Sequence, residues 1–121
     1  MSALFDGQIL FTADVVRLLR EADQLNYQIT LGECARSIDQ QRIYVQQGRS
    51  RTLRSQHLVR LAIDLNIFIA GATCTREQIE PLGTYWEALH PNNRWGGSWR
   101  GLIQSGRSIF VDAPHFERML K

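Results

Sequence analysis

The sequence predicts one small α+β domain, with a few helices packed on a mainly antiparallel sheet. Apolar residues at three- and four-residue spacing over 15–25 predict a helix, whereas alternation over 27–31 and 62–69 predicts strands. Alternating helices and strands could also form a parallel sheet, but the segments that could serve as crossovers are too few for a doubly wound one. We therefore expect residues 1–121 to form a single α+β domain.

Composition and charge limit the kind of protein this can be. The 121 residues, 44% of them hydrophobic, suffice for one modest core. No apolar run approaches the ~20 residues that span a membrane, so we expect no stable membrane insertion, and the N-terminus lacks the features of a signal peptide. We therefore expect synthesis in the cytoplasm. The net charge of +2 is too small to indicate a nucleic-acid partner, and Cys34 and Cys74 are expected to remain thiols.

Two helices are predicted in the first half of the chain. Thr12 is expected to cap the first helix. The residues of this helix expected to face the core are Val15, Val16, Leu18, Leu19, Ala22 and Leu25. Ser37, with Gln40 in the capping-box position, predicts the start of the second helix, and Gly48 predicts its end.

A third helix is predicted after Thr75, with Gln78 again in the capping-box position. Pro81 is expected to break or restart this helix, because proline lacks the backbone N–H that a helix interior uses. His90 lies at its C-terminal end, where a charge partner for the helix dipole is a better interpretation than a metal ligand.

Alternation assigns one side of each predicted strand to the core. The first strand turns one side inward with Tyr27, Ile29 and Leu31. The aliphatic side of the second strand carries Ile63, Leu65, Ile67 and Ile69. Asp64 is therefore expected to point away from the aliphatic side. Because burying an unpaired carboxylate is costly, its side chain requires a cation as a partner. A further strand is predicted over 109–112, Pro114 stiffens the chain after it, and Phe116 is expected to pack inward.

His57, Asp64 and His115 together predict a metal site. Two imidazoles and one carboxylate suit Zn²⁺, and three protein ligands leave a fourth position for water, as a catalytic zinc site requires. Asp112 lies three residues before His115, within reach of that water, and is predicted to be the general base. Either histidine alone would more readily be an ordinary core or surface residue, but the combination favours a metal.

These residues carry a resemblance to a known family. The run Ser-x-His-(x)6-Asp at 55–64 and the run Asp-x-x-His at 112–115 resemble the zinc D-alanyl-D-alanine peptidase family, peptidase family M15. The arginine, glutamine and Gly-x-Ser positions at 35–50 and the Trp-Gly-Gly-x-Trp pattern at 95–99 are similar to further segments of that family. The resemblance covers 29–117, and four segments in the right order are far more specific than any one of them.

The resemblance is closest to the L-alanyl-D-glutamate endopeptidases that tailed phages use as endolysins. It implies a fold like that of Hedgehog and the D-Ala-D-Ala peptidases, Zn²⁺ as cofactor, and hydrolysis of the stem peptides of peptidoglycan by zinc-activated water. In the family, the arginine that Arg36 matches faces the metal cleft and stabilises substrate oxygens, as a forked guanidinium can. A monomer that acts on the cell wall in the periplasm is expected.

Substrate contacts are predicted from the same segments and from the loop before His57. The residues expected to touch the substrate are Gln41, Ser50, Ser55 and Trp95. For Trp95, packing in the core is an equally good interpretation. The loop also carries Arg49, Arg51 and Arg54, which form either a solvated basic patch or contacts to peptide carboxylates.

Two other functions remain possible, and two positions differ from the family pattern. The protein could be a D-alanyl-D-alanine carboxypeptidase with the same zinc chemistry, or a non-catalytic wall-binding or scaffold protein in which zinc is structural, although Asp112 argues against the latter. Arg60 replaces the glycine of the family pattern Ser-x-His-x-x-Gly-x-Ala-x-Asp, and Ser98 replaces the aspartate of Trp-Gly-Gly-Asp-Trp. Arg60 matters more, because a long cation there could reshape the cleft or bind a substrate carboxylate.

Overall fold

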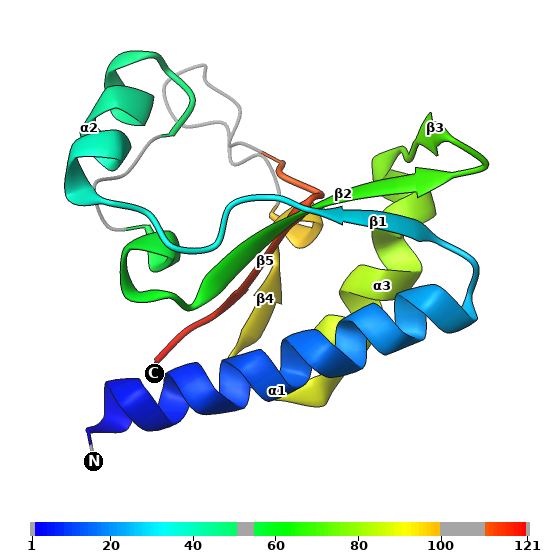
Figure 1. Ribbon diagram of the computed structural model, residues 1–121, viewed down its shortest axis with the longest axis horizontal. Coiled ribbons are helices and arrows are strands. Elements are labelled where there is room, and N and C mark those ends of the chain that lie inside the picture. Colours follow the sequence, from blue (N-terminus) through cyan, green and yellow to red (C-terminus); the bar gives the residue numbers. More distant parts are fainter. Residues whose placement is uncertain (1, 51–54, 100–110, 121) are drawn as a thin grey trace.

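Three helices and a five-stranded antiparallel sheet make up the part of the chain that the computed structural model describes, residues 2–50, 55–99 and 111–120 (Figure 1). The helices are α1 (Ala3–Gln24), α2 (Ile38–Gln46) and α3 (Arg76–Leu89). The strands are β1 (Gln28–Leu31), β2 (Ala62–Ile69), β3 (Ala72–Thr73), β4 (Asn93–Trp95) and β5 (His115–Arg118). Their order is β1-β2-β5-β4, with β3 paired to β2 as a hairpin. The predicted α+β class is confirmed.

The N-cap of helix α1 lies ten residues before the predicted one. Ser2 caps it by accepting a hydrogen bond from the backbone N–H of Phe5, whereas Thr12 lies inside the helix and its hydroxyl donates to the Gln8 carbonyl. The buried face consists of Gly7, Phe11, Asp14, Leu18 and Ala22. Val16 and Leu25 are 51% and 49% exposed, so their predicted place in the core is wrong. The stripe that faces the core starts upstream of Thr12, and its residues recur every three to four positions from Gly7.

The other two helices begin where their caps predict. Ser37 accepts from the N–H of Gln40, and Thr75 and Gln78 form the full capping box of α3. Gly48, with φ of 73°, follows the end of α2. Pro81 does not break α3, which continues through it to Leu89. The apolar residues of α3 that are buried on both sides of the proline hold the helix together, namely Ile79, Leu82 and Trp86.

The core lies between one face of the sheet and the pair of helices α1 and α3. Its residues come from α1, α3 and the strands β2 and β5. They include Phe11, Leu18, Leu65, Ile67, Ile79, Leu82, Trp86 and Phe116. Trp86 makes edge-on contacts with the rings of Phe11 and Phe116, and Phe116 is fully buried as predicted. Leu31 and Ile69 are 67% and 38% exposed, because they lie toward the ends of their strands and outside this core.

The strand predicted over 109–112 is not where the last strand lies. Residues 109 and 110 fall outside the described residues, Val111 and Asp112 are not in a strand, and β5 begins at His115. A turn precedes it, in which the His115 N–H donates to the Asp112 carbonyl across Pro114. The predicted ligand His115 is therefore the first residue of a strand and does not lie in a loop.

The state of the cysteines and the apolar content of the helices complete the description of the fold. Cys34 and Cys74 are both free thiols, as predicted. Within the described ranges, none of the helices has the length and apolar content needed to cross a membrane.

Candidate metal centre

Strand pairing brings two of the three predicted ligands together. Asp64 of β2 and His115 of β5 are directly opposite each other in the antiparallel register, although 51 residues separate them in the chain. The His115 Nδ1 atom lies 3.1 Å from the Asp64 Oδ1 atom. The third predicted ligand, His57, stands on the 3₁₀ helix η1 (Gln56–Val59), and its Nε2 atom lies 3.3 Å from the same oxygen. One potential ligand atom from each of the three residues lies within 4.8 Å of the other two.

The orientation of His57 leaves a lone pair facing the other two ligands. Its Nδ1 atom is 2.8 Å from the Cys34 carbonyl oxygen. A carbonyl oxygen only accepts, so Nδ1 carries the proton and Nε2 of the neutral ring has a lone pair. Nε2 is buried, with no hydrogen-bond partner, and it faces a carboxylate oxygen that is itself an acceptor. Two acceptors at this distance require a cation between them or a second proton on the ring.

His115 presents the same arrangement through its other nitrogen. Its Nε2 atom is 2.7 Å from Oε1 of Glu117, so an N–H donates to that carboxylate and Nδ1 is the atom left to face Asp64. Glu117 is only 6% exposed. A carboxylate behind a ligand histidine fixes the ring and raises its basicity, as is usual around protein-bound metals. Glu117 was not predicted, because its only signal in the sequence is its place two residues beyond His115, on the same side of β5.

The electrostatics show how strongly the centre favours a positive charge. Burial alone would raise the pKa of Asp64, but the neighbouring His115 and His57 rings hold it well below its usual range. Burial alone would lower the pKa of His115, but its bonds to Asp64 and Glu117 raise it to about 9. A proton thus supplies the positive charge when no metal does. Two imidazole nitrogens and one carboxylate oxygen, with lone pairs converging, fit a zinc ion.

Asp112 lies beside the three ligands on a rigid turn. Its N–H donates to the carbonyl of Gly96, and a Cβ on Gly96 would come within 2.1 Å of the Asp112 carbonyl, so only glycine allows this approach. Burial raises the pKa of the Asp112 carboxyl, against the lowering effect of the neighbouring His115 charge. The charges of Asp64, His57 and Arg36 also act on it. A carboxylate with a raised pKa beside the ligands suits a proton acceptor.

Arg36 is held against the centre by a set of fixed partners. Its side chain is 8% exposed, and its Nε atom donates to a carboxylate oxygen of Glu33 at 2.5 Å. Its Nη1 atom donates to the Gln41 side chain at 2.7 Å and to the Ser55 hydroxyl at 3.3 Å. Its Nη2 atom pairs with Glu33 and lies 3.9 Å from Oδ2 of Asp64. The guanidinium is therefore a fixed charge next to a ligand carboxylate.

Three residues predicted to contact the substrate form the support of Arg36. Gln41 is fully buried, accepts from Arg36 and donates to the Ser50 hydroxyl at 2.8 Å. Ser55 accepts from Arg36 and also caps η1 by accepting from the N–H of His57. Substrate contact by Gln41, Ser50 and Ser55 stays a prediction, but their bonds give them the task of positioning Arg36 and His57.

The two tryptophans of the Trp-Gly-Gly-Ser-Trp segment have different places. Trp95 is 1% exposed and donates from its indole to the Ala113 carbonyl at 2.7 Å, which ties β4 to the turn that carries Asp112. Of the two interpretations of Trp95, its position agrees with packing in the core, because almost none of its surface is open to a substrate. Trp99 packs its ring 5.0 Å from the ring of His115, so Trp99 is the tryptophan that borders the centre.

The loop arginines are only partly described. Arg49 stacks on the ring of Tyr44, 4.5 Å from its centroid, and Arg36 lies 4.7 Å from the same centroid. Arg51 and Arg54 lie outside the described residues. His90, predicted to be a charge partner for the helix dipole, is the C-cap residue of α3, and its Nδ1 atom accepts a hydrogen bond from the N–H of Asn92.

The chain is similar to known proteins over the residues of this candidate centre. The model of a family described as D-alanyl-D-alanine carboxypeptidase, within peptidase family M15, matches residues 48–118, which include His57, Asp64, Asp112 and His115. The chain is also similar to the crystal structure of the L-Ala D-Glu endopeptidase ChiX of Serratia marcescens. The TM-score is 0.65 and the identity 28%, over 88% of this chain and 79% of that one. Among curated proteins, no sequence matches.

Proposed function

Because the chain belongs to the D-alanyl-D-alanine carboxypeptidase family of M15 peptidases, whose model matches more than half of it, we propose that it hydrolyses stem peptides of peptidoglycan between L-alanine and D-glutamate with the help of zinc. The observation that carries the proposal is that potential ligand atoms of His57, Asp64 and His115 lie within 4.8 Å of one another, with Asp112 near enough to feel their charges. The similarity to an L-Ala D-Glu endopeptidase supports the choice of bond.

The three ligands would hold zinc through His57 Nε2, Asp64 Oδ1 and His115 Nδ1. Zinc in such a site polarises a carbonyl and lowers the pKa of water to near neutrality. Asp112 accepts the proton of the attacking water, for which its raised pKa is suited, and then delivers it to the leaving amine. Arg36, fixed beside Asp64, stabilises the oxyanion that develops on the scissile carbonyl. No covalent enzyme intermediate is needed.

The biological role we propose is that of a phage endolysin. The protein would be made in the host cytoplasm, would act as a monomer, and would reach its substrate in the cell wall on the periplasmic side. One small domain that holds the whole catalytic set is sufficient for this task. Support comes from the similarity to an L-Ala D-Glu endopeptidase and from the endolysin-like motifs of the sequence.

One other activity has an observation in its favour. The matching family is described as D-alanyl-D-alanine carboxypeptidase, so removal of terminal D-alanine is the second candidate. The ligands and Asp112 would serve both reactions equally, because the two bonds are both amides. The choice between them therefore depends on residues that bind the peptide on either side of the scissile bond.

Mass spectrometry of digested peptidoglycan distinguishes the candidates. We expect purified, zinc-loaded protein to release fragments with a free D-glutamate amine. Loss of terminal D-alanine alone would establish the carboxypeptidase instead. No cleavage by zinc-loaded protein, with a matched preparation of Asp112→Asn as the blank, would reject both and favour a non-catalytic wall-binding protein.

A further inference from the structure

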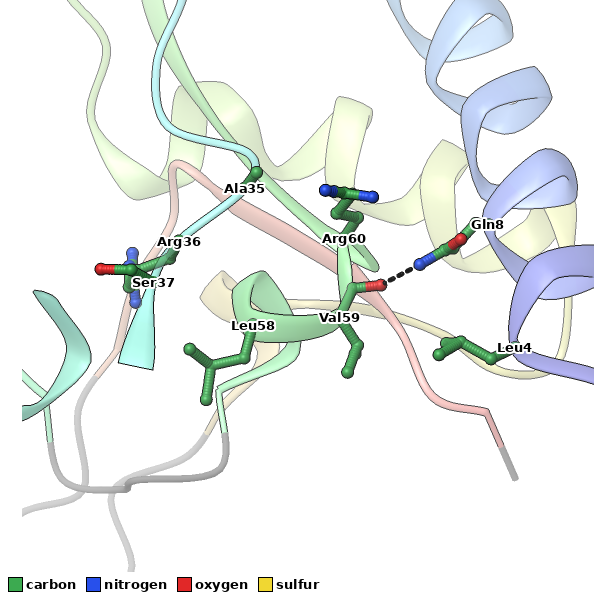
Figure 2. A pocket seen from close by; sticks show the side chains of 8 residues that line it. All are labelled: Leu4, Gln8, Ala35, Arg36, Ser37, Leu58, Val59 and Arg60. Carbon is green, nitrogen blue, oxygen red and sulfur yellow. Dashed lines mark hydrogen bonds between the residues drawn. The ribbon is translucent and has the colours of Figure 1, made fainter. Parts of the chain in front are cut away.

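A cavity of about 510 Å³ lies beside η1, between this helix and the first turns of α1 (Figure 2). Its walls come from the first turns of α1, the segment 35–37 and the end of η1. Leu4, Leu58 and Val59 give it an aliphatic side, and the polar side chains that line it are Gln8, Ser37 and Arg60, with Arg36 at its edge. The volume is in the range of roughly 300–1,000 Å³ that small-ligand sites occupy.

The backbone of Arg60 is held in a conformation that only glycine adopts freely. Its φ and ψ are 57° and 40°, in the left-handed region. It forms the end of η1, where its N–H donates to the His57 carbonyl. This explains why the family pattern has glycine at this position. A side chain that persists in such a place indicates that something compensates for the strain, and strained residues concentrate at binding sites.

The guanidinium of Arg60 is exposed, and among the described residues its charge acts on the neighbouring Cys34 thiol without an ion pair. No ion pair or hydrogen bond of its guanidinium joins it to another residue of 2–50, 55–99 or 111–120. Arg36 differs, because its guanidinium is engaged by Glu33 and Gln41 away from the cavity. Figure 2 shows the Arg60 side chain extending between Ala35 and Gln8, with Leu4, Leu58 and Val59 along the rest of the wall. The cavity thus combines one exposed cation with aliphatic surface.

We propose that this cavity binds a carboxylate of the stem peptide that lies outside the scissile bond, with Arg60 as its anchor. The identity of the peptide rests on the function proposed above. A guanidinium offers two parallel donors to a carboxylate, and the aliphatic wall suits the methylene or methyl groups next to it. Two carboxylates of the peptide have this chemistry, that of the D-glutamate residue and that of the C-terminus.

The cavity is joined to the catalytic residues by short connections. The Arg36 N–H donates to the His57 carbonyl, so the segment that forms one wall also holds η1. The Gln8 side chain donates to the Val59 carbonyl at 2.8 Å and ties α1 to the other end of η1. A peptide anchored at Arg60 would therefore be held at a fixed distance from His57. Since the family pattern has glycine at this position, the anchor would be a specificity determinant of this chain.

The test uses a probe that carries no L-Ala-D-Glu bond, namely the synthetic stem peptide that begins at D-glutamate. Two further probes each have one carboxylate converted to an amide, at the glutamate or at the C-terminus. Calorimetry measures affinity for the zinc-loaded protein, and amide shifts in NMR spectra show where each probe binds. We expect one of the two amidations to weaken binding roughly threefold to tenfold, and this identifies which carboxylate is bound.

Arg60→Gly separates the anchor from the fold. It should abolish the difference between the acid and amide probes, while its Tm stays the same or rises, because glycine relieves the left-handed strain. Ala70→Gly is the matched control, since Ala70 also has a positive φ, of 50°, in the β2–β3 turn far from the cavity. It should change Tm in the same direction and leave both affinities unchanged. Arg60→Lys should restore part of the difference.

These experiments separate a failure of the carboxylate site from a failure of the proposed hydrolysis. If amidation weakens binding equally in wild type and Arg60→Gly, or if the shifts avoid residues 35, 59 and 60, the carboxylate site is overturned even if peptidoglycan is cleaved. If the Arg60-dependent difference is found but zinc-loaded protein cleaves no peptidoglycan, the carboxylate site stands and the proposed hydrolysis is rejected.

Discussion

The two sides of the metal centre are built in different ways. Asp64 and His115 stand on paired strands, where the register of β2 and β5 and the core behind them fix both side chains. His57 stands on the short 3₁₀ helix η1, and Arg36 stands on the irregular segment before α2. Both are fixed by polar contacts, such as those to the Cys34 carbonyl, Glu33 and Gln41. We call these the strand side and the loop side of the centre.

The segment that precedes α2 connects the two sides. The Glu33 carbonyl accepts a hydrogen bond from the N–H of Asp64, on the strand side. On the loop side, the Cys34 carbonyl accepts from the ring of His57, and the Arg36 N–H donates to the His57 carbonyl. Polar contacts of this kind contribute about 1 kcal/mol each, whereas a buried strand contributes through every apolar side chain it covers. Changes on the loop side should therefore affect chemistry more than stability, and changes on the strand side should affect both.

The largest expected effect is the loss of metal from either side. We expect about one zinc per chain in the wild type by elemental analysis, and little zinc in His57→Ala or His115→Ala, because two remaining ligands bind zinc weakly. His90→Ala is the control, since His90 lies outside the centre, and it should keep its zinc. Full occupancy in both ligand variants would place the metal elsewhere.

On the loop side, Arg36→Ala should lower turnover by about 10²-fold, in the range for loss of one oxyanion donor, and should lower stability much less. Arg49→Ala is the matched control, because Arg49 stacks on the same ring of Tyr44 but makes no described contact with a ligand. Turnover and thermal unfolding are measured on the same preparations. Parallel losses of activity and stability would make Arg36 a structural residue.

On the strand side, Glu117→Gln should weaken zinc binding by roughly tenfold, because the amide still accepts from His115 but no longer raises the basicity of its ring. Competition with a chelator measures the affinity. Glu80→Gln, which changes an exposed ion pair on α3, should leave zinc affinity as it is. An unchanged affinity in Glu117→Gln would mean that Glu117 serves only the sheet.

The smallest effect concerns the metal-free protein and pH. The pKa of His115 is raised from 6.5 to about 9, so its stabilising contribution is complete below pH 6.5 and is lost as the pH rises through about 9. Asp64 has a lowered pKa, so its contribution is lost as the pH falls below its usual value of 3.8. Thermal unfolding should therefore show a loss of stability toward pH 9 that zinc removes. An alkaline loss of equal size with zinc bound would contradict this origin.

The sequence predicted those parts of the fold that leave a local signal, namely β2 and the starts of α2 and α3, better than the start of α1 and the position of β5. A period of two placed Asp64 opposite the aliphatic core, and caps at Ser37 and Thr75 marked two helix starts, because these signals are local. The start of α1 was misplaced because its apolar stripe is interrupted by the buried Asp14, which pairs with Arg118. An ion pair between residues 104 apart in the chain leaves no local pattern.

The cluster of candidate ligands was predictable, but the residues that support it were not. His57, Asp64 and His115 are distinctive residue types in a distinctive order, and the structure brings them together. The bond from His57 to the Cys34 carbonyl could not be predicted, because every residue has a carbonyl and only tertiary structure selects one. Glu117 was missed because the last strand was expected before Pro114 rather than after it.

The role of Asp112 distinguishes a catalytic zinc centre from one in which zinc only stabilises the fold. Asp112→Asn keeps the size of the side chain, and the backbone bonds between residues 96 and 112 do not involve the carboxylate. Zinc content, Tm and release of D-glutamate amines from peptidoglycan are to be measured on one preparation. We predict full zinc, an unchanged fold and a loss of activity of ~10²-fold or more, as general base catalysis typically supplies. Full zinc with near-normal activity would remove Asp112 from the mechanism, and loss of zinc together with activity would show that Asp112 is a ligand and not the base.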